Sequence, residues 1–577
     1  MRRILMMFLS LFLIISLIGC QKEDQGEEFE KFINNYIIDN IGSDYTSIHT
    51  YFENPEDYGI DMKNVEVKLG TRATDESFKE QKDKLNKTKK EFDKFDKDKL
   101  DKQQQIIYEI FKNELNDNIT LSQDKYKYLG TVFESDYGVQ VDIPMLFTDW
   151  ELRNEQDVKD LILLVKDVLP YIDSLLDYTK EQAEKGYLMV DIDSVVDYCD
   201  NLIKSKENNS TLSAMKENID ALKLKNANEY KKQLEEAFVS SFIPAYSHIS
   251  KELKKLKSYK NNTKGLKYLD GGKEYYEDLV QSKVGVDSSM SDIKKDIEER
   301  AYKTLKDMQE IYTKDSNAFQ RATHLKTKYN SYEDMLKDLG KFIQKDFPDV
   351  GDIKYNIKNI NPEIASNGIG AYFMVPAIDG KTPKKIRVNN TKNNDIKSID
   401  TFKKIAHEGL PGHMYLHAYT YLNCPLYSKL SSVSGFQEGY ATYVELVALD
   451  YLNLDKNAVE LLKCNEIYTE CMIILADIGI HYEGWSLSDL KNFFVSRGLS
   501  INDENCKKQY EQLQGNPVAF FPYYLGLIEI LDLKDEAQEE LGNRFESKDF
   551  HEALIKNGPT YFSVVEESIE EYIDNKN

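Results

Sequence analysis

The chain has few of the residues that cross-link or interrupt a fold. Among 577 residues there are only 6 cysteines, 13 prolines and 28 glycines. Apart from Cys20, the cysteines are odd in number and irregularly spaced, which argues against both a disulfide framework and a cysteine-rich zinc site. We therefore predict mostly buried, unpaired thiols at the remaining positions, Cys199, Cys424, Cys464, Cys471 and Cys506.

Positive charge and nucleotide-binding motifs are also scarce. The 75 lysines and arginines are outnumbered by 99 aspartates and glutamates, which gives a formal net charge of −24 at pH 7. An acidic surface repels phosphate backbones, so nucleic acid is not an expected partner. The sequence has no dinucleotide fingerprint or nucleophile-elbow serine, and Gly271-Gly272-Lys273 lacks the rest of a phosphate loop. These absences argue against nucleotide-dependent and serine-hydrolase chemistry.

A single long apolar run is present, at the N-terminus. Two arginines precede apolar residues 4–18, and the run closes in Leu17-Ile18-Gly19-Cys20. The run is too short to span a bilayer comfortably, and its end resembles the bacterial lipobox, where cleavage before a cysteine leaves that residue to carry lipid. We predict a lipoprotein signal peptide at residues 1–19 and an extracytoplasmic protein anchored to the membrane through lipidated Cys20. An ordinary cleaved signal followed by a chance cysteine is the alternative.

Helical periodicity dominates the chain from residue 27 to about residue 345. Apolar residues recur at steps of three and four between lysines and glutamates, the pattern of amphipathic helices. The charge runs on these segments are typical of solvated helix faces. Residues 20–345 are therefore predicted to form a bundle-like helical scaffold, with long helices in the segments Lys79–Leu115, Glu155–Lys185, Ala214–Leu256 and Ser291–Asp315.

A small β element is predicted between residues 350 and 390. Three short stretches there carry β-branched or aromatic residues between turn-forming proline, glycine and asparagine. The helical pattern resumes at Asp400, a candidate N-cap, and places His407 and Glu408 late in the new helix. The predicted fold class is thus mainly α with a small antiparallel sheet, whose two or three strands are Tyr355–Ile360, Gly370–Val375 and Lys385–Asn389.

Three of the chain's eight histidines and one glutamate lie within residues 407–417. A His-Glu pair followed by a second histidine is how zinc hydrolases place two neutral imidazoles on a metal, while the glutamate polarises water. The usual spacing of the histidines is four residues, but here Pro411 occupies that position and His413 comes six residues after His407. In an unbroken helix the two rings would lie about 120° apart around the axis.

Pro411 and Gly412 offer a way for His413 to face His407. Pro411 has no N–H for the carbonyl of His407, and glycine accepts backbone angles that other residues avoid. We predict a kink or bulge at this point, a defect that is frequent at functional sites. A rival pairing of His413 with His417, four residues apart, needs no kink, and a site without metal is the third alternative.

A third metal ligand is expected from a downstream helix. The segment Gly435–Glu445 contains Glu438 and Glu445, which are seven residues apart and so point to the same side of a helix. Aromatic neighbours place this helix in the interior, where a carboxylate without a metal or other partner is costly. At least one of the two glutamates is therefore expected to have a specific role, and a salt bridge or an exposed position is the alternative for each.

Six short sequence motifs, each present once in the chain, together carry a family resemblance. They are H-E-x-x-P-G-H at His407–His413, E-G-x-A-x-Y-x-E at Glu438–Glu445, D-x-G-x-H-x-x-G-W at Asp477–Trp485, P-x-x-x-x-x-Y-x-x-G at Pro517–Gly526, L-G-x-R-F at Leu541–Phe545 and F-H-x-A-x-x-x-x-G at Phe550–Gly558. Together they resemble the bacterial family catalogued as domain of unknown function 885 (DUF885), which itself resembles helical zinc metallopeptidases of the gluzincin type. The resemblance covers nearly the whole mature chain as one domain, with a gluzincin-like catalytic region at residues 346–577.

The resemblance implies a metal centre and a catalytic glutamate. The family pattern carries over His407, His413 and Glu438 as the ligands of one Zn²⁺ ion, and Glu408 as the general base and acid. Tyr523 matches a tyrosine whose phenol is placed to donate to the oxyanion of a tetrahedral intermediate. The alternative for Tyr523 is a core aromatic.

Three further residues are candidates for substrate binding. Asp477 and His481, four apart on one helical face, are assigned to the substrate or the transition state, and a satisfied buried histidine is the alternative for His481. Tyr372 lies in Gly370–Val375, a strand expected to hold an extended peptide by edge pairing. The chain lacks the arginines expected just ahead of Asp477 and Pro517, which leaves its specificity open.

These patterns together predict a lipid-anchored, mostly helical zinc metallopeptidase that acts on short peptides outside the cytoplasm. A non-enzymatic lipoprotein that binds peptides or solutes is the first alternative. The second is a zinc hydrolase of another amide or ester, because the same site serves both reactions. Nothing in the sequence indicates the oligomeric state.

Overall fold

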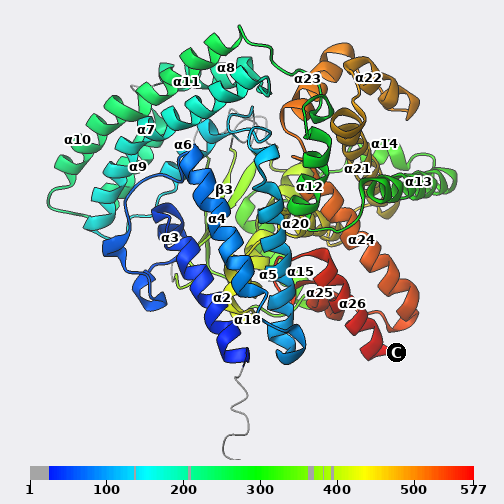
Figure 1. The fold of residues 1–577 in the computed structure, drawn as a ribbon. Helices are drawn as coiled ribbons and strands as arrows, with labels where there is room; N and C mark the ends of the chain where they lie inside the picture. The colour runs from blue at the N-terminus through cyan, green and yellow to red at the C-terminus, as the bar shows by residue number, and fades with distance from the viewer. Residues whose placement is uncertain (1–24, 136–137, 206–208, 361–369, 381–382, 391–394) are drawn as a thin grey trace, which may run out of the picture.

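Helices make up most of the molecule, as the periodicity predicts, and a small sheet lies among them (Figure 1). The computed structural model describes residues 25–135, 138–205, 209–360, 370–380, 383–390 and 395–577. The predicted signal peptide at residues 1–19 and the predicted lipid-bearing Cys20 lie outside the described residues.

The first helices lie at the front of the molecule in the view of Figure 1. One predicted helical segment falls in this region, and the structure divides it. The predicted segment Lys79–Leu115 contains two helices, because α4 stops at Phe92 and the Asp101 side chain caps a new helix by accepting a hydrogen bond from Gln104 N. This group comprises α2 (Gln25–Ile41), α3 (Tyr45–Tyr51), α4 (Asp75–Phe92), α5 (Lys102–Leu121) and α6 (Val139–Thr148).

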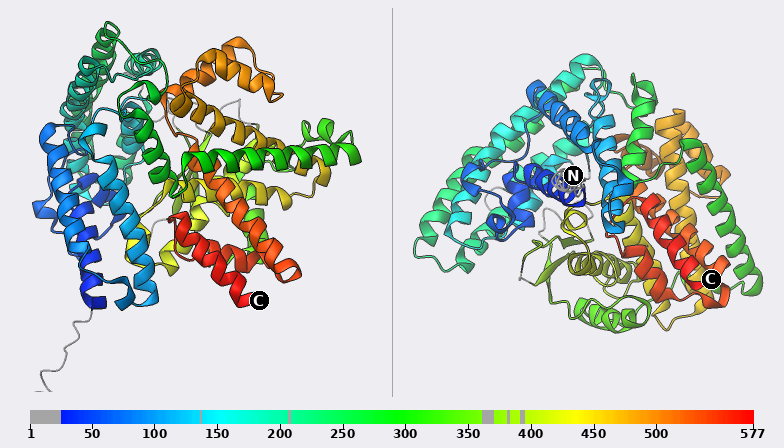
Figure 2. Two further views of the ribbon diagram at one scale, coloured as in Figure 1. Left: turned by 45° about the vertical axis from the view of Figure 1, so that its right-hand side comes forward. Right: turned by 60° about the horizontal axis from the view of Figure 1, so that its bottom comes forward.

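A second group of helices forms one side of the molecule (Figures 1 and 2). The long helix at its centre matches the predicted segment Glu155–Lys185, and Asn154 caps its start with a capping box. The predicted segment Ala214–Leu256 divides into shorter pieces joined in part by a π-helical turn, η6 (Phe238–Phe242). The group comprises α7 (Glu155–Lys185), α8 (Ile192–Lys204), α9 (Ser210–Ala221), α10 (Ala227–Ala237) and α11 (Ile243–Leu256).

The remaining helices build the other side. Four of them precede the sheet: α12 (Gly272–Val284), α13 (Met290–Lys314), α14 (Ala318–Ala322) and α15 (Tyr332–Asp346). Those that follow it are α17 (Ile399–Glu408), α18 (His413–Asn423), α19 (Leu426–Leu430), α20 (Ser434–Asp450), α21 (Lys456–Ile478), α22 (Leu487–Ser496), α23 (Asp503–Gly515), α24 (Phe521–Leu541), α25 (Ser547–Ile555) and α26 (Phe562–Lys576). Buried residues of α12, α13 and α15 share one apolar core with α17, α18 and α20–α26.

The sheet has three strands at the predicted places, but it is mixed. Its strands are β1 (Tyr355–Asn359), β2 (Ala371–Met374) and β3 (Lys384–Val388), in the order β1-β3-β2. β2 and β3 are antiparallel, as predicted, whereas β1 runs parallel to β3. The predicted antiparallel pairing of β1 is therefore wrong. Because β2 runs opposite to both other strands, β1 and β3 have the same direction, and the place of β3 in the middle of the sheet makes them neighbours.

The two faces of the sheet carry different residues. Ile386 and Val388 of β3 are 0% and 1% exposed and belong to the core, whereas Lys385 and Arg387 alternate with them and lie on the opposite face. Phe373 of β2 pairs with Ile386 and so shares the core face. The sheet thus has an apolar face toward the helices that follow it and a charged face toward the earlier ones.

Two sequence expectations concern the whole chain. The five cysteines outside the N-terminal segment are unpaired, and all but the half-buried Cys464 are buried, as predicted. Within the described residues, no helix combines the length and the apolar character that crossing a membrane would need.

Candidate metal centre

The first two site residues lie at the end of α17. Ser398 caps this helix by accepting a hydrogen bond from Thr401 N at 3.0 Å, so the predicted cap, Asp400, falls in the first turn instead. The helix ends at Glu408, which places His407 and Glu408 in its last turn, as predicted.

A break of four residues separates α17 from α18, where the sequence predicts a kink or bulge. Gly412 N–H donates to Ala406 O at 2.9 Å, outside the helical pattern. A Cβ on Gly412 would lie 1.8 Å from His407 O, so a larger residue would displace the backbone. The chain turns at this point, and α18 starts at His413.

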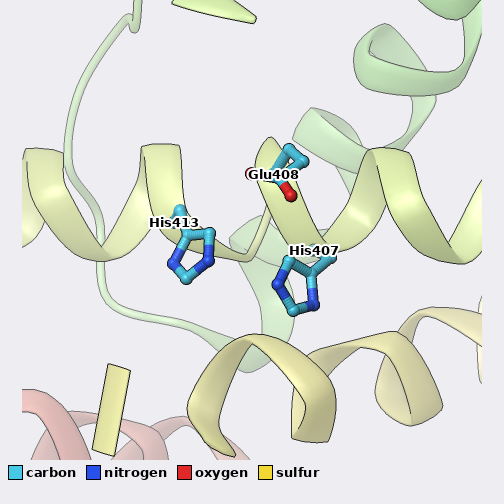
Figure 3. Close-up of side chains that lie close together, drawn as sticks. All are labelled: His407, Glu408 and His413. Carbon is cyan, nitrogen blue, oxygen red and sulfur yellow. The ribbon is translucent and has the colours of Figure 1, made fainter. Parts of the chain in front are cut away.

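The break brings the two imidazoles together. The ring centroids of His407 and His413 are 4.8 Å apart, and Figure 3 shows the rings facing the same space from two successive helices, with Glu408 beside them. One ligand atom from each of His407, Glu408 and His413 lies within 4.8 Å of the others, so this group could hold a metal ion. Within the described part of the chain, His417 does not belong to the group. The geometry favours the pairing of His407 with His413.

Glu438 on α20 provides a carboxylate oxygen between the two imidazoles. Its Oε2 lies 3.4 Å from His407 Nε2 and 3.3 Å from His413 Nε2. In a tetrahedral zinc site with ligand distances of about 2.0–2.1 Å, neighbouring ligand atoms are about 3.3 Å apart. Both distances from Glu438 fit that separation, and two imidazoles with one carboxylate are a donor set typical of catalytic zinc.

A chain of charged side chains stands behind His407. His407 Nδ1 lies 2.8 Å from Glu445 Oε1, and the other oxygen of Glu445 lies 3.2 Å from Lys403 Nζ. Lys403 also contacts Glu466 Oε2 at 2.9 Å. With Nδ1–H as donor to Glu445, the lone pair of His407 is on Nε2, on the side of Glu438. Glu445 therefore orients the His407 imidazole, and sequence analysis missed both Lys403 and Glu466.

The charges at the centre shift pKa values in opposite directions. Burial by itself lowers the pKa of His407, but hydrogen bonds to Glu438 and Glu445 outweigh it and hold this pKa well above its ordinary value. Burial raises the pKa of Glu438, but the charge of His413 and hydrogen bonds from both imidazoles bring it well below its usual range. For Glu445, the charge of Lys403 and the bond from His407 overcome burial and lower the pKa to about 2. Two ionised carboxylates thus attract positive charge to this point.

Glu408 lies beside the ligand set and is held by the sheet. Its Oε2 accepts a hydrogen bond from Phe373 N at 2.8 Å. Phe373 belongs to β2, an edge strand, and its N–H points away from β3. Burial raises the pKa of the Glu408 carboxyl, although the imidazoles and the Phe373 N–H act in the opposite direction. A raised pKa suits a carboxyl group that exchanges a proton near neutral pH.

Tyr523 lies near His407 because two helices cross closely. The centroids of the two rings are 6.2 Å apart, with an angle of 19° between their planes, and Pro522 stands in the first turn of α24. Where α24 packs on α20, a Cβ on Gly439 would lie 2.3 Å from the backbone carbon of Gly526. This crossing requires glycine in both motif blocks, and it brings the start of α24 close to His407.

His481 and Asp477 form a separate buried group. Leu266 N–H donates to His481 Nδ1 at 3.1 Å, and His481 Nε2 donates to Leu513 O at 2.9 Å. The Tyr276 hydroxyl donates to Asp477 Oδ1 at 2.5 Å. Burial lowers the pKa of His481 to about 4 and raises that of Asp477 to about 7. Both nitrogens of His481 are occupied by backbone groups, so neither is left for a metal or a substrate, and the roles proposed for His481 and Asp477 stay predictions.

Tyr372 points to the charged face of the sheet. Its hydroxyl donates to Asp149 Oδ2 at 2.6 Å, beside the ion pair of Asp149 with Arg387. Together with Phe373 it lines a cavity of about 230 Å³ between the sheet and the chain that links α6 to α7. Tyr372 therefore borders a space next to the strand that holds Glu408, but its hydroxyl already has a partner within the protein.

Comparison with known proteins identifies relatives along almost the whole chain. A family model described as "Bacterial protein of unknown function (DUF885)" matches residues 57–569. A search of curated proteins finds no match.

Two solved structures share the fold. One is described as "the putative lipoprotein from Colwellia psychrerythraea"; it has 17% sequence identity and a TM-score of 0.79, over 96% of this chain and 100% of that one. The other is "a putative lipoprotein of unknown function from Shewanella oneidensis", with 15% identity and a TM-score of 0.61, over 93% of this chain and 99% of that one. At these identities the likeness concerns the fold.

Proposed function

The chain belongs to the DUF885 family of bacterial proteins of unknown function, and from that premise and the site geometry we propose that it is a zinc-dependent peptidase. The observation that carries the proposal is the position of Glu438, whose Oε2 lies 3.3–3.4 Å from one nitrogen of each imidazole. A second carboxylate, Glu445, takes the remaining nitrogen of His407, as outer partners of zinc-bound histidines do.

His407, His413 and Glu438 would hold the metal. Three protein ligands leave a fourth position open, which distinguishes a catalytic zinc site from a structural one. Bound there, zinc would polarise a substrate carbonyl and make water more acidic.

Glu408 would carry the proton through the reaction. The Phe373 N–H holds Oε2 and so orients the carboxyl group, which leaves Oε1 for proton transfer. Its raised pKa lets it take a proton from the attacking water and return that proton to the departing amine. Glu408 acts here as a general base and then as a general acid.

Tyr523 would stabilise the charge that develops on the substrate carbonyl oxygen. Its ring lies parallel to that of His407 at 6.2 Å, close enough for the phenol to reach an oxygen bound beside the ligands. A neutral O–H donor aimed at a developing oxyanion lowers the barrier without being consumed.

Short peptides are the substrates that this site would accept most readily. His407 and His413 are only 8% and 9% exposed, so a folded protein could not bring its backbone to them without unfolding locally. The edge strand β2 lies next to the centre, although the Phe373 N–H is already used by Glu408. A peptide would therefore pair with β2 only through its other outward groups.

We also propose that the protein is a lipoprotein, anchored outside the cytoplasm through Cys20. Supporting observations are the lipobox-like sequence that ends at Cys20 and the absence, within the described residues, of a helix able to cross a membrane. The solved proteins of the same fold from Colwellia and Shewanella are each described as a "putative lipoprotein".

Metal analysis and a peptide screen test the proposal. The mature protein, purified without chelator, should contain about one zinc per chain and should cleave members of a mixture of short peptides, with cleavage abolished by a chelator and restored by zinc. Failure to bind any transition metal after zinc is supplied would reject the proposal that the protein is a metal-dependent enzyme. Bound zinc with cleavage of esters or non-peptide amides alone would keep the hydrolase and change the substrate.

A further inference from the structure

Lys384, the first residue of β3, is a cation for which the described residues offer no counter-ion. It precedes Ile386 and Val388 at two-residue steps along β3 and therefore lies on the same face of the sheet as they do, the core face. Its Nζ lies 5.3 Å from the centre of the Tyr421 ring. Among the described residues it forms no ion pair, and burial lowers its pKa to about 8. Such a charge is costly unless something negative approaches it.

The neighbouring cations differ from Lys384 in this respect. On the opposite face of the sheet, Lys385 is paired with Glu151 and Arg387 with Asp149. Lysines and arginines of the strand are thus neutralised on that face, whereas Lys384 relies on the face of an aromatic ring, which compensates a buried ammonium only in part.

A histidine with an unpartnered ring nitrogen in the described structure lies beside the same aromatic ring as Lys384, that of Tyr421. His417 follows His413 by one turn of α18, and its Nδ1 is buried without a hydrogen-bond partner in the described structure. Its ring is 5.7 Å from Phe373 and 4.3 Å from Tyr421. Burial, then the positive charges of Lys384 and His413, lower the pKa of His417 to about 3. The ring is therefore neutral at physiological pH and has one N–H to donate.

These groups line two neighbouring cavities, one of which is bordered by His413 of the proposed metal centre. One cavity of about 80 Å³ is bordered by His413, His417, Tyr421 and Val375. The cavity of about 230 Å³ described above is bordered by Lys384 and Val375, and by Phe373, whose N–H holds Glu408. Val375 is common to both cavities. Lys384 thus borders one cavity and His417 borders the other, together with the proposed zinc ligand His413, and both side chains lie beside the Tyr421 ring.

We infer that Lys384 and His417 form a carboxylate-binding subsite beside the metal centre, which selects peptides by a carboxylate close to the bond that is cut. This inference rests on the proposed function for its substrate class. An ammonium group and an N–H donor bind a carboxylate through charge-assisted hydrogen bonds, and the exchange of water for this pair is most favourable in a partly buried space. The terminal carboxylate and an acidic side chain are the two sources of this group in a peptide.

Binding to an inactive variant tests the subsite. Zinc-loaded Glu408→Gln protein is titrated by calorimetry with three N-acetylated tripeptides: one that ends in phenylalanine as the free acid, its C-terminal amide, and a C-terminal amide that ends in glutamate. We expect the free acid to bind about 10- to 100-fold more tightly than its amide, the range of a hydrogen bond to a charged group. Recovery of the affinity by the glutamate amide would assign the subsite to a side-chain carboxylate.

Matched variants locate the effect. In the same background, Lys384→Met should remove the preference for the carboxylate and Lys384→Arg should keep most of it. Lys385→Met changes the adjacent lysine, which is paired on the opposite face, and should leave the preference intact. The inference fails if acid and amide bind equally, if no probe binds, or if Lys384→Met keeps the preference.

Hydrolysis by the unsubstituted zinc-loaded protein separates this inference from the proposed function. Selective binding of the acid with no cleavage of any peptide would reject the peptidase and leave the subsite standing. Cleavage of acid and amide with equal kcat/KM would reject the subsite and leave the peptidase standing.

Discussion

Two buried groups of histidine and carboxylate in this protein look alike in sequence but differ in what their nitrogen atoms do. At the metal centre, the Nε2 atoms of His407 and His413 both face one oxygen of Glu438. In the second group, Nδ1 and Nε2 of His481 are both taken by backbone groups. Burial does not separate the two, since all three histidines are less than 10% exposed.

The comparison shows that a histidine's role follows from its hydrogen-bond partners more than from its motif. A ring held by backbone on both sides joins the two segments that carry those backbone groups, and it has no nitrogen left for a metal or substrate. A ring with one nitrogen on a carboxylate is oriented and still has a lone pair to offer, which is the arrangement around bound zinc. Five predictions test this distinction, from the largest expected effect to the smallest.

The first prediction compares the replacement of one histidine by alanine in each of the two groups. His413→Ala should abolish zinc binding and all measurable peptide cleavage, because it removes one of the two nitrogens that face Glu438. His481→Ala should keep zinc and lower the free energy of unfolding by about 1–3 kcal/mol for each backbone group left without a partner. Elemental analysis and denaturant unfolding measure the two effects. Loss of zinc from His417→Ala, with retention in His413→Ala, would show that the rival pair is the real one.

The second prediction concerns the base. Glu408→Gln should bind zinc as the unsubstituted protein does and lower kcat about 10²- to 10⁴-fold, because the amide cannot accept the proton of water. Steady-state kinetics on a peptide found by the screen gives kcat, with zinc content measured on the same sample. Near-native turnover would disprove the proposed role of this residue.

The third prediction removes a single hydroxyl. Tyr523→Phe should retain zinc and lower kcat about 10²- to 10³-fold with a smaller change in KM, the scale for loss of one oxyanion donor. The neighbouring Tyr524→Phe serves as a matched control, and we expect it to change kcat less. If Tyr524→Phe instead lowers kcat more than Tyr523→Phe does, the oxyanion donor is Tyr524.

The fourth prediction tests the support behind His407. Glu445→Gln should weaken zinc affinity about 10- to 100-fold, because the neutral amide polarises the imidazole less than a carboxylate does. Competition with a chelator of known affinity measures the change. An unchanged affinity would mean that Glu445 serves only to balance the charge of Lys403.

The fifth prediction concerns Asp477 and the dependence of stability on pH. Its pKa is raised from an ordinary value of 3.8 to about 7, so its protonated form is favoured in the folded state. The stability that it contributes is present below pH 4 and is lost as the pH rises to 7, by a few kcal/mol, at most about 4, in total. Asn at this position still accepts the Tyr276 hydroxyl, so Asp477→Asn should gain up to about 3 °C in Tm over the unsubstituted protein between pH 5 and pH 8. The raised pKa of Asp477 would be contradicted if the Tm difference between Asp477→Asn and the unsubstituted protein were the same at pH 5 and at pH 8.

Much of the site was predictable because it depends on neighbours in the chain. The helical pattern before His407, the missing N–H of Pro411 and the small side chain of Gly412 together predict that the helix is interrupted between the two histidines. The structure shows an interruption at this point, as a full break of four residues. Lys403, four residues before His407, also carried a signal of shared helix face, but spacing alone does not distinguish it from any solvent-exposed lysine.

Partners from distant parts of the chain were not predictable in the same way. Glu438 and Glu445 are equivalent by periodicity, and the packing of α17 on α20 decides that Glu438 faces both imidazoles while Glu445 lies behind His407. The same holds for β1, whose pairing with the parallel strand β3, and not with β2, depends on which strand lies in the middle of the sheet.

The sequence by itself determined the mainly helical class, the place of the three strands, the interruption before His413 and the acidic character of the chain. These follow from backbone sterics and from the spacing of apolar residues, which act over a few positions. Only the tertiary structure decided that His481 is satisfied by Leu266 and Leu513, and that Lys384 has no counter-ion among the described residues. Hydrogen bonds and charges act through space, so their partners are set by how helices and strands far apart in the chain pack against each other.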